Sequence, residues 1–113
     1  MKKYVAVIEM TSWMGTHQHI VKGDSASELL SEFEEIQSLK CLVRMGRMEE
    51  NASGQKQLDK LEVIFEKKMN GELTIAELKK MNIKLSIGSV QCMEVFEGEM
   101  IEERLKIRFP NAK

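Results

Sequence analysis

The two histidines of the chain lie close together, in a segment that also carries the only tryptophan. His17 and His19 are two residues apart, so on a β-strand both imidazole rings would point to the same face of the sheet. Such a pair could bind a divalent metal ion, but the sequence places no third ligand beside it, and we predict no metal site. Trp13 adds a surface for stacking. We therefore consider Trp13, His17 and His19 candidate contacts to a ligand.

The arginines are a second set of residues that could do chemistry. All four lie in segments with strand-like patterns: Arg44, Arg47, Arg104 and Arg108. A guanidinium group offers a planar pair of donors that matches phosphate and carboxylate groups. On a strand, Arg104 and Arg108 would share one face, and Arg44 could join them there. This strip is our candidate site for a nucleotide or another small anion; the alternative is a solvated face whose arginines pair with neighbouring glutamates.

No sequence motif for catalysis is present. The chain contains no GxGxxG or P-loop glycine pattern, no GxSxG motif, and no cysteine adjacent to a histidine. Cys41 and Cys92 are far apart and lack the spacing of zinc ligands, so we interpret both as small apolar core residues. We therefore expect a protein that is not an enzyme, and we predict no cofactor.

Two further segments provide alternative functions. In the helix predicted after Ser25, glutamates at three- and four-residue spacing form an acidic stripe, which could dock in a basic groove of a partner protein. A partner could also contact exposed methionines, of which the chain has nine. Residues 73–83 resemble the first helix and turn of a helix-turn-helix DNA-binding domain, with the last strands as a wing. However, Leu78 is large where that motif needs a small residue, and residues 84–89 have few base-reading side chains.

The first part of the chain predicts a hairpin followed by a helix. Alternating and β-branched residues at 4–10 indicate a central strand that is buried on most of both faces. Residues 12–16 form a turn, and 17–21 return as the antiparallel partner. Ser25 and Glu28 have the spacing of a capping box and begin an amphipathic helix.

The rest of the chain mixes the two patterns. We predict a short strand at 41–48, an exposed loop at 49–55 and an amphipathic helix at 58–69. A second capping-box spacing, at Thr74 and Glu77, begins a short helix.

Two strands are predicted at the end of the chain. They cover 90–96 and 104–109, with a turn between them and Pro110 as a stop. The order is therefore β-β-α-β-α-α-β-β. It predicts an α+β fold in which about five mostly antiparallel strands carry helices on one face.

Composition limits the classes of function. The chain has 113 residues, of which 42% are hydrophobic and 31% charged, as expected of one globular domain spanning residues 1–113. The net charge of −1 provides no overall attraction to nucleic acid or membranes. Glu9 interrupts the first apolar run, so we expect no signal peptide and a cytoplasmic protein. Open sheet edges make a homo-oligomer plausible.

Our leading hypothesis is a non-catalytic binding protein that binds or sequesters a small anionic, nucleotide-like ligand, as a bacterial or phage accessory protein could. The alternatives are a protein-interaction module or inhibitor that acts through its acidic first helix, and a winged-helix-like DNA-binding regulator. The candidate ligand-binding residues are Trp13, His17, His19, Arg44, Arg104 and Arg108.

Overall fold

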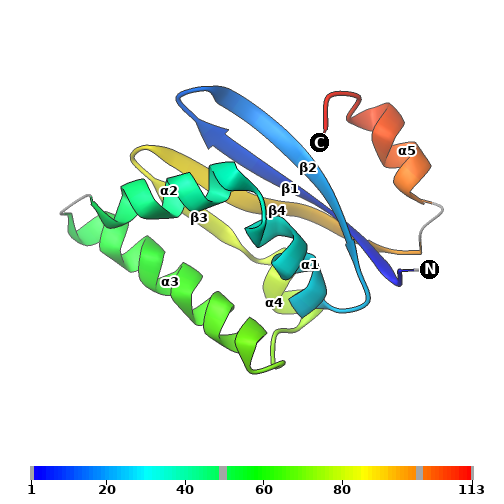
Figure 1. Cartoon of the computed structure of the whole chain (residues 1–113), viewed down its shortest axis with the longest axis horizontal. Coiled ribbons are helices and arrows are strands. Elements are labelled where there is room, and N and C mark those ends of the chain that lie inside the picture. Colours follow the sequence, from blue (N-terminus) through cyan, green and yellow to red (C-terminus); the bar gives the residue numbers. More distant parts are fainter. Residues whose placement is uncertain (1, 49–50, 99–100, 113) are drawn as a thin grey trace.

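The computed structural model describes residues 2–48, 51–98 and 101–112, which form an antiparallel sheet with helices on both faces (Figure 1). The strand order in the sheet is β2-β1-β4-β3. In chain order the elements are β1 (Tyr4–Ser12), β2 (Gly15–Gly23), α1 (Ala26–Glu34), α2 (Gln37–Arg47), α3 (Ala52–Met69), α4 (Ile75–Lys79), β3 (Asn82–Leu85), β4 (Gly88–Glu97) and α5 (Ile101–Arg108). The α+β class is therefore confirmed, with four strands rather than five among the described residues.

The β1–β2 hairpin forms as predicted, and β1 is a central strand that pairs with both β2 and β4. Val5 and Val7 point to one face of the sheet, whereas Ala6 and Ile8 point to the other, and all four are fully buried. A two-residue turn joins Ser12 to its partner in β2. Both faces of β1 are thus covered, which explains its near-continuous apolar sequence.

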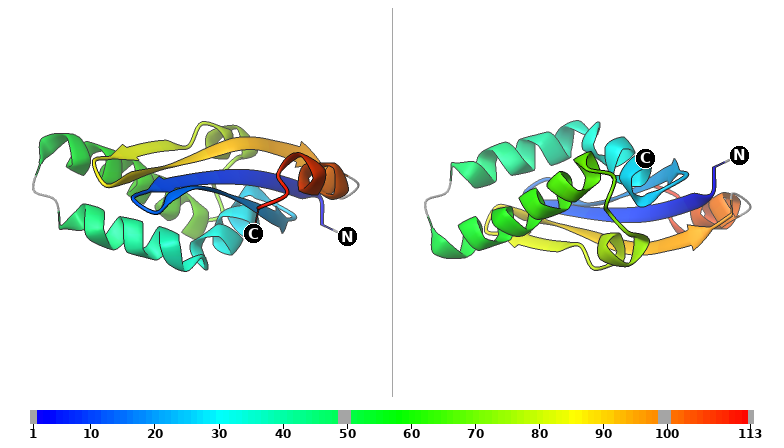
Figure 2. Two further views of the ribbon diagram at one scale, coloured as in Figure 1. Left: turned by 90° about the horizontal axis from the view of Figure 1, so that it is seen from above. Right: turned by 90° about the horizontal axis from the view of Figure 1, so that it is seen from below.

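The face of the sheet that α1 to α4 cover, which we call the inner face, holds most of the core. Phe33 and Leu30 of α1 pack in one buried cluster with Ile8 and Met10 of β1. The opposite, outer face is partly covered by α5, and Figure 2 shows α5 and the other helices on different sides of the strands. The prediction that all helices pack on one face is therefore wrong for α5.

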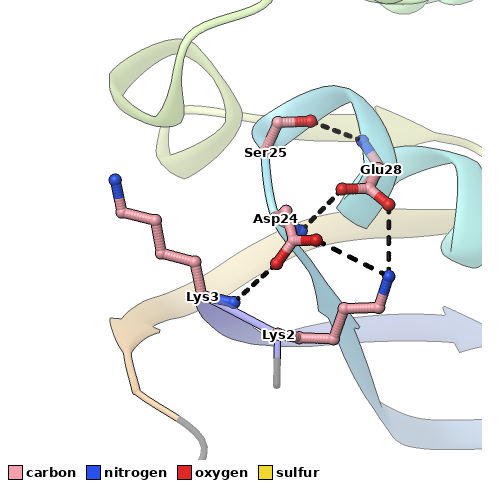
Figure 3. Close-up of polar contacts among 5 residues, drawn as sticks. All are labelled: Lys2, Lys3, Asp24, Ser25 and Glu28. Carbon is pink, nitrogen blue, oxygen red and sulfur yellow. Dashed lines mark hydrogen bonds and ion pairs between the residues drawn. The ribbon is translucent and has the colours of Figure 1, made fainter.

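Polar contacts at the start of α1 connect this helix to the N-terminal end of β1 (Figure 3). The Ser25 hydroxyl accepts the backbone N–H of Glu28 at 3.2 Å, as the predicted capping box requires. The Glu28 carboxylate, however, accepts the N–H of Asp24 at 2.8 Å rather than that of Ser25. Asp24 in turn accepts the backbone N–H of Lys3 at 2.9 Å. The side-chain carboxylates of Asp24 and Glu28 thus connect the start of α1 to the residue before β1.

The middle of the chain is more helical than predicted. The segment 41–48 belongs to helix α2, not to a strand, and the helix expected at 58–69 begins earlier, at Ala52. Helix α2 begins after Ile36, which has no side chain that can cap a helix, so the usual start signal is missing. Asn51 does cap α3, because its side chain accepts the N–H of Gly54. Residues 49–50 of the predicted loop lie outside the described residues.

The C-terminal part differs most from the prediction. Helix α4 has the predicted capping box, but it is followed by strand β3, which the sequence did not predict. The segment 104–109, predicted as a strand, forms most of helix α5. Leu105 is buried against Val5 and Val7, whereas Ile107, which alternation would also bury, is 81% exposed. Burial in this segment therefore follows the geometry of a helix and not the alternation of a strand.

The outer face has an apolar end and a polar end. Near α5 it presents Val5 and Val7, but near the β1–β2 turn it presents hydrogen-bonded polar pairs. Gln18 donates to Glu9 at 3.0 Å, and the hydroxyls of Thr11 and Thr16 lie 3.0 Å apart. None of the described helices combines the length and apolar character needed to span a bilayer.

Candidate functional site

Three of the candidate residues, Trp13, His17 and His19, line one cavity beside the β1–β2 turn. We call this cavity the hairpin pocket; its volume is about 400 Å³, and it lies between the hairpin and helix α2. Its other lining residues include Met10, Met14, Cys41 and Met45. The structure therefore brings the predicted hairpin residues together and adds four sulfur-containing side chains.

Strand geometry and helix geometry together position these groups. His17 and His19 share the inner face because they are two residues apart on β2. Met10 lies directly opposite His17 in the β1–β2 register. Cys41 and Met45 come from successive turns of α2, four residues apart, so both can face the hairpin. The pocket is thus formed by one hairpin and one side of a helix.

The two histidines have different environments within the pocket. His19 is buried, and its ring meets the edge of the Phe33 ring with 6.2 Å between centroids. His17 is exposed near the turn. Among the described residues, no three histidine, cysteine or acidic side chains lie close enough to hold a metal ion. His19 therefore has a place in the core, whereas His17 can reach a bound molecule.

The two cysteines also differ, and the prediction that both belong to the core is wrong for Cys41. Cys41 is exposed beside the hairpin pocket, whereas Cys92 is buried on β4. Burial raises the pKa of the Cys92 thiol to about 11, so it stays protonated at neutral pH. Of the two, only Cys41 is placed to contact a ligand.

The rim of the hairpin pocket is apolar and open to solvent. Trp13 is 82% exposed and Met14 is 68% exposed, both at the tip of the hairpin. Met45 of α2 is also exposed, and Met48 follows it at the end of the same helix. Of the described residues that line the pocket, none is a lysine, an arginine or an acidic residue. The pocket therefore offers stacking, thioether and imidazole contacts.

The structure does not form the predicted arginine strip. Arg104 and Arg108 lie on helix α5 rather than on a strand, toward the opposite end of the molecule's long axis from the β1–β2 turn (Figure 1). Arg108 donates to Glu94 at 3.2 Å and lies over the Phe109 ring. Arg44 lies on helix α2, not on a strand, and lines a different cavity. The predicted placement of all four arginines on strands is therefore wrong.

The acidic side of α1 is less isolated than the sequence indicates. Three of its carboxylates form ion pairs with lysines from other segments: Glu28 with Lys2, Glu34 with Lys68, and Glu35 with Lys40. The Glu28 carboxylate, through its hydrogen bond and its charge, raises the pKa of Lys2. A basic partner would have to compete with these lysines.

The segment similar to a helix-turn-helix domain does not form one. Helix α4 has five residues and is followed by strand β3, in the place where a recognition helix would begin. The resemblance on which the DNA-binding hypothesis rested is therefore not present in the structure.

Sequence reasoning found the hairpin half of the pocket and missed the helix half. Cys41 and Met45 were assigned to a strand, where residues four apart also share a face but lie much farther apart than on a helix. A helical interpretation of this segment would have placed Cys41 and Met45 side by side, on adjacent turns of one helix face. What remained invisible is which face meets the hairpin, since that depends on tertiary packing.

We compared the chain with protein-family models, curated proteins and solved structures, and none of them matches it.

Proposed function

We propose that this chain is a non-catalytic protein-binding module whose contact surface is the hairpin pocket and its rim. The observation that carries the proposal is the exposure of Trp13, the only tryptophan, at the tip of the hairpin. Exposed tryptophans surrounded by other apolar side chains are typical of interaction surfaces, and tryptophan is the residue type most enriched among binding hot spots. Methionine side chains beside it can adapt to different partner surfaces.

The partner that fits this surface is a protein segment that presents a large apolar side chain. The hairpin pocket has room for one or two such side chains, and exposed Met14 and Met45 would flank them. Binding would remove Trp13 and these methionines from water, which supplies the main favourable free energy. His17 can add a hydrogen bond at the edge of the contact.

A nucleotide-like ligand is less well supported than a protein partner. Among the described residues, no lysine or arginine lines the hairpin pocket to bind a phosphate group. A second cavity, of about 550 Å³, also borders Trp13, and among its described lining residues Lys84 is the one basic side chain. The arginines that motivated a nucleotide ligand lie elsewhere.

The proposal can be tested by selecting peptides from a displayed random library against the immobilised protein. Peptides with aromatic or large aliphatic side chains should be enriched, and they should bind the wild type but not Trp13→Ala. Because Trp13 is the only tryptophan, its fluorescence emission should shift to shorter wavelength when it is covered. Ile107→Ala serves as the control, since it removes an equally exposed apolar side chain on α5.

Two results would contradict the proposal. One is that peptides selected on the folded wild type bind Trp13→Ala with unchanged affinity. The other is that a nucleotide, rather than any peptide, shifts the emission of Trp13 in a saturable way.

A further inference from the structure

A third cavity lies between helices α2 and α3, away from the hairpin pocket. We call it the α2–α3 groove; its volume is about 510 Å³. Near the end of α2 the two helices pack closely, since a Cβ atom on Gly46 would lie 3.4 Å from Leu58 of α3; it would also lie 2.8 Å from Leu85 of β3. From there α2 and α3 diverge, as Figure 1 shows. The groove occupies the space that this divergence opens, so it is a direct result of how the two helices pack.

The groove has an apolar floor and a basic rim. Leu39, Val43 and Phe65 provide apolar lining, and Leu39 is also part of the main core. Lys40, Arg44 and Arg47 lie on α2 at spacings of four and three residues, which places them along one side of that helix. A ligand in the groove would therefore meet apolar side chains below it and cations along one edge, while Glu34 and Glu35 also line the groove.

The cations differ in how far they are already neutralised. Lys40 lies 3.8 Å from Glu35, and Arg47 lies 3.5 Å from Glu62. Arg44 has no carboxylate partner among residues 2–48, 51–98 and 101–112, although it borders the groove. At the wide end of the groove, Glu34 is paired with Lys68. The net attraction for an anion is thus strongest at Arg44, beside the apolar floor.

From this arrangement we infer that the α2–α3 groove binds an amphipathic organic anion, with its apolar body on Val43 and Phe65 and its anionic head group on Arg44. The volume is within the range of small-molecule sites, roughly 300–1,000 Å³. A guanidinium group can donate two parallel hydrogen bonds to a carboxylate, which fixes the orientation of the ligand as well as its charge. This site is separate from the hairpin pocket and does not depend on the proposed protein partner.

Octanoate and its neutral counterpart octanamide test the inference directly, by NMR titration of isotope-labelled protein. Octanoate should shift the backbone amides of α2 and of Phe65 in a saturable way. Octanoate should bind about tenfold more tightly than octanamide, because a charge-assisted hydrogen bond from Arg44 favours the carboxylate over the neutral amide. In Arg44→Gln that preference should disappear, and Arg44→Lys should restore only part of it. Arg104→Gln, on α5, is the matched control and should behave as the wild type.

Several outcomes would overturn the inference, and the spectrum itself shows whether each variant is folded. Equal affinity for the acid and the amide in the wild type would mean that the groove is apolar only. Shifts confined to the hairpin pocket, or no saturable shift, would exclude the groove as the site. If an acidic amphipathic peptide shifted these amides and octanoate did not, the occupant would be a helix, and the inference of a small anion would be wrong.

Discussion

The inner and outer faces of the sheet are covered to different extents. On the inner face, residues from four helices form one extensive cluster in which Ile8, Leu29 and Phe33 are completely buried. On the outer face, the buried cluster of the described residues consists of Val5, Val7 and Leu105, under a helix of eight residues. Because hydrophobic stabilisation grows with the apolar area removed from water, the inner face carries most of the stability. The outer helix should therefore be able to detach while the rest stays folded.

The strongest test of this comparison is Phe33→Ala. Phe33 is the largest fully buried side chain, so its truncation should lower the free energy of unfolding by about 3–5 kcal/mol. Urea denaturation followed by circular dichroism measures the change, and the transition should remain a single step. A loss comparable with that of exposed Ile107→Ala would show that the inner cluster is not the main source of stability.

Leu105→Ala tests the outer face and should have a smaller effect. We expect a loss of about 2 kcal/mol, at the low end for leucine truncation, because the cluster around Leu105 is small. Hydrogen exchange of α5 amides should accelerate more than that of β1 amides. Ile107→Ala, on the exposed side of the same helix, is the control. If β1 and α5 accelerated equally, the two faces would unfold as one unit.

Thr74→Ala tests the edge of the inner layer, where α4 begins. The Thr74 hydroxyl accepts the N–H of Glu77 at 3.1 Å, and loss of such a cap typically costs about 1 kcal/mol. Thermal or urea unfolding measures the change. Ser31→Ala, at an exposed position within α1, should not destabilise the protein, because alanine is the better helix former there. Equal effects of the two substitutions would argue against the cap.

The smallest expected effect is a pH dependence of stability that arises from Glu77, the partner of Thr74 in the capping box of α4. The hydrogen bond from Lys67, followed by those from Thr74, lowers the pKa of Glu77 in the folded protein. Glu77 thus stabilises the fold above the ordinary glutamate pKa of about 4.3, and this contribution is lost as the pH falls through the lowered pKa. The urea midpoint of the wild type should fall more steeply in this window than that of Glu77→Gln. Parallel profiles would contradict the assignment.

Parts of the fold that depend on local signals were predictable from the sequence. The β1–β2 hairpin follows from alternation and a turn, and the starts of α1 and α4 follow from Ser25 and Thr74. Parts that depend on distant partners were not. The segment from Arg104 to Phe109 alternates like a strand, and it becomes a helix that covers Val5 and Val7. Local pattern could not reveal that these valines needed a cover.

The same division applies to the hairpin pocket. Trp13, His17 and His19 were predicted as candidates because they are close in sequence, and all three line the hairpin pocket. Cys41 and Met45 were missed because α2 has no side-chain cap and was assigned to a strand. The arginine strip failed for the same reason, since alternation holds Arg104 and Arg108 together only if the segment is extended.

The strand order has a consequence for synthesis of the chain on the ribosome. The second neighbour of β1 is β4, and β4 starts 76 positions after the end of β1. At roughly 5–20 residues per second, synthesis of β1 is complete about 4–15 s before synthesis of β4 begins. Throughout that interval the apolar edge of the nascent β1–β2 hairpin has no native partner. Helix α1 can dock early against the inner face of the hairpin, because Phe33 packs in the same buried cluster as Ile8. The Phe33 side chain would then cover this face well before the sheet is complete.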